Sequence, residues 1–282
     1  MSNRADVVDV LDLEPTGVDS YRGESLTDSH GVVFGGQLMA QIVTVAGLAL
    51  PDKRVKSVHN VFARGGDPEQ PLALRVVRQH AGRSFATVAV TVAQDERLCT
   101  SALVLMQSAE PDLIRHQAAM PTSKGPDSAT PKYLARGWEV RIDDDVDLYD
   151  PEAVGPPELN VWSRFSNGPH DASTSQALLA YASDGFLIGT AMRPHAGVGQ
   201  SMAHVSISTS VISQTVTFHD EFDAADWHLL AHESPHAGGG RSYGRAHVFT
   251  ADWRLVASYD QQNMIRAFAA DRRPAPGTVS KY

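Results

Sequence analysis

The chain has 282 residues, of which 42% are hydrophobic and 20% charged, and its formal net charge is −9. This composition fits a soluble globular protein of one large or two ordinary domains, and the negative charge disfavours nucleic-acid binding. A single cysteine, Cys99, excludes an internal disulfide and a cysteine zinc site. No apolar stretch reaches the ~18 residues that span a bilayer, and the N-terminus lacks an apolar leader. We therefore expect a cytoplasmic protein without membrane contact.

The first half is predicted to hold one helix followed by strands, after an arm at residues 1–20. Gly35-Gly36 opens a segment over 37–50 that is apolar nearly all round and ends at Pro51. A helix with apolar residues on every face is usually a buried one. Enrichment in Val, Thr and Phe, with turn signals between the runs, then predicts strands at Val55–Ala63, Leu72–His80, Ser84–Gln94 and Leu98–Gln107.

Residues 108–165 are predicted to form a long surface connector, because prolines recur throughout them. The acidic run Asp143-Asp144-Asp145 within it is expected to be a solvated face rather than a metal site. The second half then repeats the order of the first, and residues 271–282 are expected to be a loose tail. Its predicted elements are a helix at Ala172–Met192 and strands at Val205–His219, Trp227–Ser234, Ser242–Thr250 and Leu255–Phe268.

Two Gly-Arg-Ser strings indicate an internal repeat. Arg83 and Arg241 stand 158 residues apart, and a phenylalanine, an aspartate turn and the start of an apolar run recur at offsets of 156 to 157. Two copies of one supersecondary unit predict a pseudo-symmetric α+β protein with units at 20–110 and 166–270, joined by a linker at 111–165. An antiparallel sheet that wraps around each central helix is the arrangement that buries it on all sides.

Two motifs are rejected as chemical sites. The string Gly240-Arg241-Ser242-Tyr243-Gly244 matches a serine-hydrolase elbow, but that motif needs a helix after the serine, and an alternating strand follows here. His228, His232 and His236 recur every four residues, but they lie in a strand-like segment and Pro235 interrupts them. We therefore expect no bound metal.

Two polar residues stand out in apolar segments of the second half. A buried, unpaired carboxylate costs several kcal/mol, so Asp184 in the second helix needs a partner or a shifted pKa. A structural hydrogen bond to a strand and a functional role explain Asp184 equally well. Gln261 lies in the last apolar run, where the alternative is an amide that faces solvent.

From residue 25 to about 268 the chain resembles the type II acyl-CoA thioesterase family, which has the double hotdog fold. Each short string is weak alone, and their order and spacing carry the resemblance. The strings of the first half are Val33-Phe34-Gly35-Gly36-Gln37, Ser57-Val58-His59, Arg64-Gly65-Gly66-Asp67, Gly82-Arg83-Ser84-Phe85, His116-Gln117 and Met120-Pro121. Those of the second half are Leu179-Ala180-Tyr181-Ala182-Ser183-Asp184, Pro194-His195, Phe218-His219 and Val256-Ala257-Ser258.

The resemblance implies hydrolysis of fatty acyl-CoA to free acid and CoA, without a cofactor, by a water that an Asp, a Ser or Thr and a Gln orient. The first and last of these fall on Asp184 and Gln261. The family shows Ser or Thr, an apolar residue, Asp and His where this chain has Val211-Ile212-Ser213-Gln214. Ser213, two residues after Val211 and expected on the same strand face, is the candidate for the missing hydroxyl.

Substrate binding is expected at the helix start and at the repeated arginines. Backbone N–H groups near Gly35 and Gly36 could polarise a carbonyl, because helix N-termini favour negative charge. Arg83 and Arg241 are candidates for the CoA phosphates, with plain surface charge as an equal alternative.

The resemblance also implies a homo-oligomer. Because Val211 replaces the hydroxyl, an acyl-CoA-binding or regulatory protein with weakened catalysis is the alternative function. A hotdog enoyl-CoA hydratase is disfavoured, because its Asp…His signature is missing.

Overall fold

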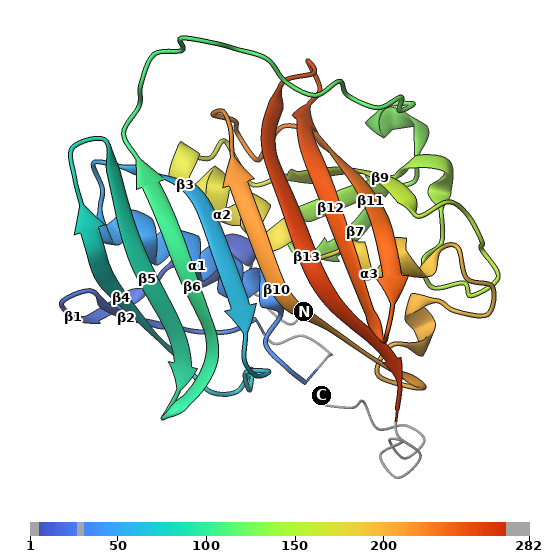
Figure 1. The fold of residues 1–282 in the computed structure, drawn as a ribbon, viewed down its shortest axis with the longest axis horizontal. Coiled ribbons are helices and arrows are strands. Elements are labelled where there is room, and N and C mark those ends of the chain that lie inside the picture. Colours follow the sequence, from blue (N-terminus) through green and yellow to red (C-terminus); the bar gives the residue numbers. More distant parts are fainter. Residues whose placement is uncertain (1–5, 27–30, 269–282) are drawn as a thin grey trace.

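In a computed structural model that describes residues 6–26 and 31–268, the strands form one antiparallel sheet whose helices lie along one face (Figure 1). The strand order is β1-β2-β4-β5-β6-β3-β10-β13-β12-β11-β9-β8-β7. We call the face toward the helices the inner face and the opposite one the outer face. Among the described residues, no helix is both long and apolar enough to cross a membrane. The tail expected at 271–282 lies outside the described residues.

The first half comprises η1 (Val7–Leu11), β1 (Glu14–Gly17), β2 (Ser20–Gly23), α1 (Gly35–Ala49), β3 (Arg54–Phe62), β4 (Leu72–Ala81), β5 (Phe85–Gln94) and β6 (Arg97–Gln107). The expected connector holds η2 (Pro126–Ser128), β7 (Lys132–Ala135), β8 (Trp138–Ile142), η3 (Asp143–Asp145) and β9 (Glu158–Phe165). The second half comprises α2 (Ala172–Ala182), α3 (Leu187–Met192), η4 (Gln200–Met202), β10 (Ile207–Phe218), β11 (His228–Gly238), β12 (Arg241–Thr250) and β13 (Leu255–Ala267).

The internal repeat is confirmed by the strand order. Strands β4-β5-β6-β3 of the first half and β11-β12-β13-β10 of the second have the same order. The two half-sheets are joined edge to edge where β3 pairs with β10, with Val58 opposite Val216. The predicted α+β double hotdog class is therefore confirmed, with both half-sheets continuous in a single sheet.

The two long helices lie side by side and run in opposite directions. A Cβ atom at Gly47, near the end of α1, would lie 3.1 Å from Oγ of Ser173 at the start of α2. At the other end, a Cβ at Gly36 would lie 2.2 Å from the carbonyl oxygen of Tyr181. The apolar residues of α1 are buried from Leu38 to Ala46, as the sequence predicted for a buried helix. Thr44 and Gly47 are partly buried, and Leu48 near the end of the helix is exposed.

Two local predictions differ from the structure. The single helix expected over Ala172–Met192 is two helices, because Ser183, Asp184 and Gly185 end α2, and these residue types favour turns. The expected connector is in part ordered strand: β9 pairs with β11 and extends the sheet through β8 and β7. Its earlier portion crosses the outer face, where Met120 packs on a small apolar cluster of Trp162, Leu229 and Phe249.

Candidate functional site

Asp184 lies in the break between α2 and α3, at the N-terminus of α1. The backbone N–H of Gly36 donates to Oδ2 of Asp184 at 3.0 Å, across 148 residues of chain. A Cβ at Gly35 would lie 2.8 Å from the same oxygen, so glycine at this position allows the carboxylate to approach the helix. The N–H of Gly36, expected to polarise a substrate carbonyl, is thus occupied by Asp184.

The electrostatics of Asp184 suit a general base. Burial raises the pKa of Asp184 from 3.8 to about 7, while the hydrogen bond from the Gly36 N–H opposes that rise. The positive end of the α1 dipole acts in the same direction as this hydrogen bond, because it favours the carboxylate form. A carboxyl group with a pKa near neutrality can take a proton from water and release it again.

Gln261 meets Asp184 directly, although 77 residues separate them. Nε2 of Gln261 donates to Oδ1 of Asp184 at 3.2 Å and to the carbonyl oxygen of Ser183 at 3.0 Å. The amide also contacts Oε1 of Gln214 at 3.2 Å. Oε1 of Gln261 is buried and has no partner among the described residues. The structure therefore brings the acid and the amide that the sequence singled out into direct contact.

Ser213 does not join them, so the expectation that it shares a face with Val211 is wrong. A β-bulge lies between Val211 and Ser213: Val211 pairs with the buried Asn263, whereas Ser213 pairs with the exposed Gln262. Cross-strand partners share a face, so Ser213 lies on the outer face of the sheet. The bulge adds one residue to β10 and thereby reverses the alternation on which the expectation rested.

A pocket of about 920 Å³ opens beside Asp184. Its apolar lining comes from the segment before α1, from α1, β3, α3 and β10, and includes Val33, Phe34, Leu38, Phe62, Ile188 and Val211. Three arginines, Arg64, Arg241 and Arg266, also line the pocket, and Asp184 is the one carboxylate among its described lining residues. The pocket can thus hold an apolar chain near a buried carboxylate and an anionic group near its arginines.

The second arginine candidate lies elsewhere. The carbonyl oxygen of Arg83 accepts a hydrogen bond from Nζ of Lys53 at 3.0 Å, and Lys53 follows the C-terminal end of α1. Asp184 contacts the other end of that 15-residue helix, which at 1.5 Å per residue is about 22 Å long. Arg83 is therefore on the wrong end of α1 to bind a ligand together with Arg241.

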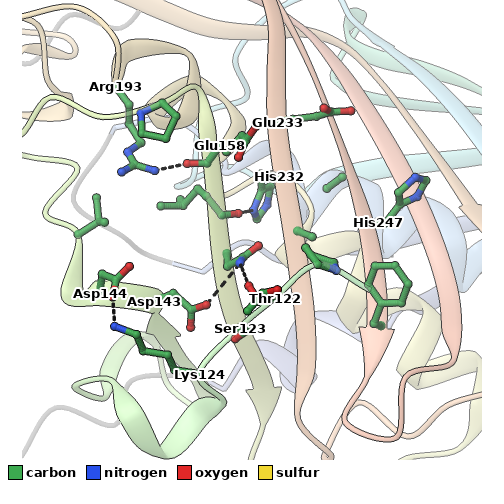
Figure 2. A pocket seen from close by; sticks show the side chains of 18 of the residues that line it. Thr122, Ser123, Lys124, Asp143, Asp144, Glu158, Arg193, His232, Glu233 and His247 are labelled. Atoms are coloured by element: carbon green, nitrogen blue, oxygen red, sulfur yellow. Dashed lines mark hydrogen bonds and ion pairs between the residues drawn. The ribbon is translucent and has the colours of Figure 1, made fainter. Parts of the chain in front are cut away.

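A second pocket, of about 740 Å³, lies on the outer face over β9, β11 and β12 (Figure 2). Its charged side chains already bind one another or the backbone: Lys124 pairs with Asp144, and Arg245 pairs with Glu233. Because the charges are mixed and largely paired, this pocket does not select a ligand.

Among the described residues, no three His, Cys, Asp or Glu side chains are arranged to hold a metal. Ser242 of the rejected elbow lies within β12, with no helix after it.

Sequence reasoning missed Gln214, Thr209 and the two arginines Arg64 and Arg266. Gln214 is a second buried amide, but it lies in a strand rich in Ser and Thr, so no apolar pattern marks it in the sequence. Thr209 lines the pocket from the inner face of β10, before the bulge. The arginines come from loop and strand ends far apart in the chain, so no local pattern connected them.

Comparisons with known proteins agree with the fold and show the family. A family model described as the acyl-CoA thioesterase N-terminal domain matches residues 25–107, and one described as the C-terminal domain matches residues 115–265. An acyl-CoA thioesterase 2 of Haemophilus influenzae is 30% identical over 92% of this chain and 96% of its own length. An acyl-coenzyme A thioesterase 8 of Rattus norvegicus is 30% identical over 93% and 89% of the two chains. The crystal structure of an acyl-CoA thioesterase II from Mycobacterium marinum superposes with a TM-score of 0.80 at 30% identity, covering 93% of this chain and 99% of that one.

Proposed function

The chain belongs to the acyl-CoA thioesterase family and hydrolyses acyl-CoA thioesters, and we propose that Asp184 and Gln261 carry the reaction. The observation that supports this assignment is the direct contact of Gln261 with a buried carboxylate whose pKa is about 7. Asp184 lines a pocket with an apolar wall, which suits the acyl chain of a fatty acyl-CoA, and Gln261 is hydrogen-bonded to Asp184.

The reaction needs one water and one proton shuttle. The Asp184 carboxylate accepts a proton from water while the water oxygen bonds to the thioester carbonyl carbon, and the carbonyl electron pair moves to its oxygen. When this intermediate collapses, the carbon–sulfur bond breaks and the electron pair leaves with the CoA sulfur. Asp184 returns the proton to that thiolate, so the products are a free acid and CoA. Throughout these steps the side-chain oxygen of Gln261 accepts a hydrogen bond from the other O–H of the attacking water.

The arginines of the pocket would bind the phosphates of CoA. Arg64, Arg241 and Arg266 give a positive rim to a protein of net charge −9, and guanidinium groups match phosphate geometry. This assignment keeps Arg241 and leaves out Arg83. A change of Arg241 to Glu should raise KM for acyl-CoA. It should change kcat little, because it leaves Asp184 in place.

The decisive experiment replaces Asp184 by Asn and measures free-thiol release from a panel of acyl-CoAs. Loss of a general base lowers turnover by roughly 10²-fold or more, and the far-UV circular dichroism should stay unchanged. The matched control is Asp143→Asn, which removes a carboxylate from the outer pocket and should keep wild-type turnover. If Asp184→Asn turns over as fast as the parent, the assignment is wrong. If the wild type binds acyl-CoA but releases no thiol, the alternative of a binding protein, which Val211 favours, replaces it.

We also propose that the protein is a homo-oligomer that associates through the outer face of the first half. Large apolar side chains stand exposed there on β3 to β6: Val61, Val77, Phe85, Leu103 and Leu105. In the second half, the chain's own connector packs on the corresponding face. Light scattering should show that Leu103→Glu dissociates the assembly, whereas Leu113→Glu, at an exposed leucine outside these strands, does not. A wild-type monomer at micromolar concentration would contradict this.

A cytoplasmic location and a role in fatty acid metabolism complete the proposal. The single thiol, Cys99, is buried, and burial raises its pKa, so it remains reduced and unreactive.

A further inference from the structure

A second buried glutamine, Gln214, lies beside the proposed catalytic pair. It is on β10 immediately after the bulge, where its cross-strand partners are Gln261 on β13 and Asn60 on β3. Its side chain is fully buried on the inner face. An uncharged amide in an apolar core is costly unless both its ends are hydrogen-bonded, so its contacts are informative.

The hydrogen bonds of Gln214 have a fixed direction. Ser183 Oγ–H donates to the carbonyl oxygen of Ala180 at 2.8 Å, which uses the one hydrogen of that hydroxyl. Ser183 Oγ must therefore accept, and it accepts from Nε2 of Gln214. This leaves Oε1 of Gln214 toward Gln261, whose Nε2 donates to it at 3.2 Å. The end of α2 thus sets the orientation of Gln214, and Gln214 in turn sets that of Gln261.

The orientation of the Gln261 amide decides what it can do. With Nε2 held toward Gln214, the backbone oxygen of Ser183 and Asp184, its Oε1 points away from all three and is the free acceptor. If the amide were turned over, the oxygen would face the oxygen of Gln214 and the carboxylate, and it would repel both. A buried free acceptor beside a general base is the feature needed to hold a water hydrogen.

We propose that Gln214 is a positioning residue that presets Gln261 to hold the attacking water. This inference rests on the proposed roles of Asp184 and Gln261. It also explains the departure at this position, where the family shows His. Like a neutral imidazole, an amide offers one donor side and one acceptor side, but unlike an imidazole it does not titrate in the working pH range.

The test compares Gln214→Met with a matched control. Methionine keeps the length and removes the amide, so Gln261 loses one of the three acceptors that orient its Nε2 and is held less firmly. We expect kcat to fall about 10- to 100-fold, the scale of a small misplacement of a reacting group. KM should change less than about twofold, because Gln214 does not line the pocket. The control is Gln176→Met: this buried amide of α2 donates only to the carbonyl oxygen of Val55, at 2.8 Å, away from the site. It should keep wild-type kcat.

A rescue variant separates positioning from packing. Gln214→His restores a donor and an acceptor, so its kcat should approach that of the wild type at pH 8. Asp184 gives both proteins the same loss in acid, so the readout is the ratio of the two kcat values. That ratio should fall below the pKa of the new imidazole, because the protonated ring cannot accept from Gln261. Should the Met variant fail to fold, this pH split decides the question alone.

Three outcomes overturn the inference: wild-type kcat in Gln214→Met, an equal kcat loss in Gln176→Met, or a His variant whose kcat relative to the wild type does not change with pH. Asp184→Asn is measured in parallel. If that variant is inactive while Gln214→Met is not impaired, only the positioning role fails. If Asp184→Asn is fully active, the site assignment itself fails.

Discussion

At the scale of single residues, the proposed chemistry depends on the ionisation of Asp184. Two effects oppose each other: burial raises its pKa, and the Gly36 N–H stabilises the carboxylate, with burial dominant and a resulting pKa of about 7. An aspartate that only held two helices together would make weaker hydrogen bonds if it became protonated at physiological pH. The raised pKa therefore favours the functional reading over the structural one.

The pH dependence of the reaction follows from that pKa. The base must be ionised, so kcat/KM should rise about tenfold per pH unit below pH 7 and level off above it. Initial rates of thiol release between pH 5 and 9 will show this rise and the plateau above pH 7. A profile that is flat from pH 5 to 7 would exclude Asp184 as the base.

The same pKa makes a prediction about stability. In the unfolded chain Asp184 ionises near 3.8, and in the folded protein near 7, so ionisation opposes folding once the pH exceeds 3.8, with the full penalty above about 7. Asp184→Asn removes this penalty. Its melting temperature should exceed that of the wild type at pH 8, and the difference should shrink as the pH falls toward 4. A constant difference across this range would show that the carboxyl group is not buried as described.

The site could be predicted from sequence where a polar residue interrupts an apolar pattern. Asp184 and Gln261 were found in this way. Ser213 was misplaced, because a bulge inserts one residue without any local signal and reverses the face of all that follow. Arg83 was misassigned because a repeat gives two equivalent positions and cannot say which copy carries the site.

At the scale of elements, the bulge in β10 places Val211 rather than Ser213 at the pocket. Val211 pairs with Asn263 on the inner face and lines the pocket near Asp184. This apolar residue takes the position at which the family carries a hydroxyl. The bulge thus separates two side chains that simple alternation would have put together.

A hydroxyl at position 211 should assist the reaction. Val211→Thr conserves shape and should raise kcat about 3- to 10-fold, a part of the 10²-fold that a well-placed donor contributes. Ser213→Ala is the control and should leave kcat unchanged, because that side chain lies on the outer face. Steady-state kinetics of both variants decide the point, and a loss of activity in Ser213→Ala would contradict the described register.

At the scale of the whole molecule, the pseudo-symmetry is in fold and not in chemistry. The repeat offset places Val58 and Val104 of the first half where the second half has Gln214 and Gln261, and both valines are fully buried. The start of α2, which corresponds to the start of α1 by the repeat, therefore has two valines where the start of α1 has Gln214 and Gln261. The second half thus carries Asp184 and the two glutamines of the proposed site, and the first half supplies Gly36 at the start of α1.

Binding should accordingly show one site per chain. Titration calorimetry with a non-hydrolysable thioether analogue of acyl-CoA should give one ligand per polypeptide, and Arg241→Glu should weaken it. Two equal sites would contradict the assignment of a single pocket.

The repeat in the sequence was sufficient to predict two equivalent units, their strands and their central helices. The join between the units was not predictable, because no residue type in β3 or β10 indicates that these two strands pair with each other. Strands β7 to β9 were missed for a related reason: prolines and acids around them dominated the local signal, while pairing with β11 is a long-range effect.

The seam between β3 and β10 has a consequence for synthesis. A ribosome adding about 5–20 residues per second completes the first half on the order of 10 s before β10 emerges. During that interval β3 is an open edge, with a row of unpaired backbone groups ready to accept any strand. The seam has two-fold symmetry, so the edge that fits β3 best besides β10 is β3 of another nascent chain. A chain halted after Gln107 would thus assemble in pairs, each copy taking the place of the missing half.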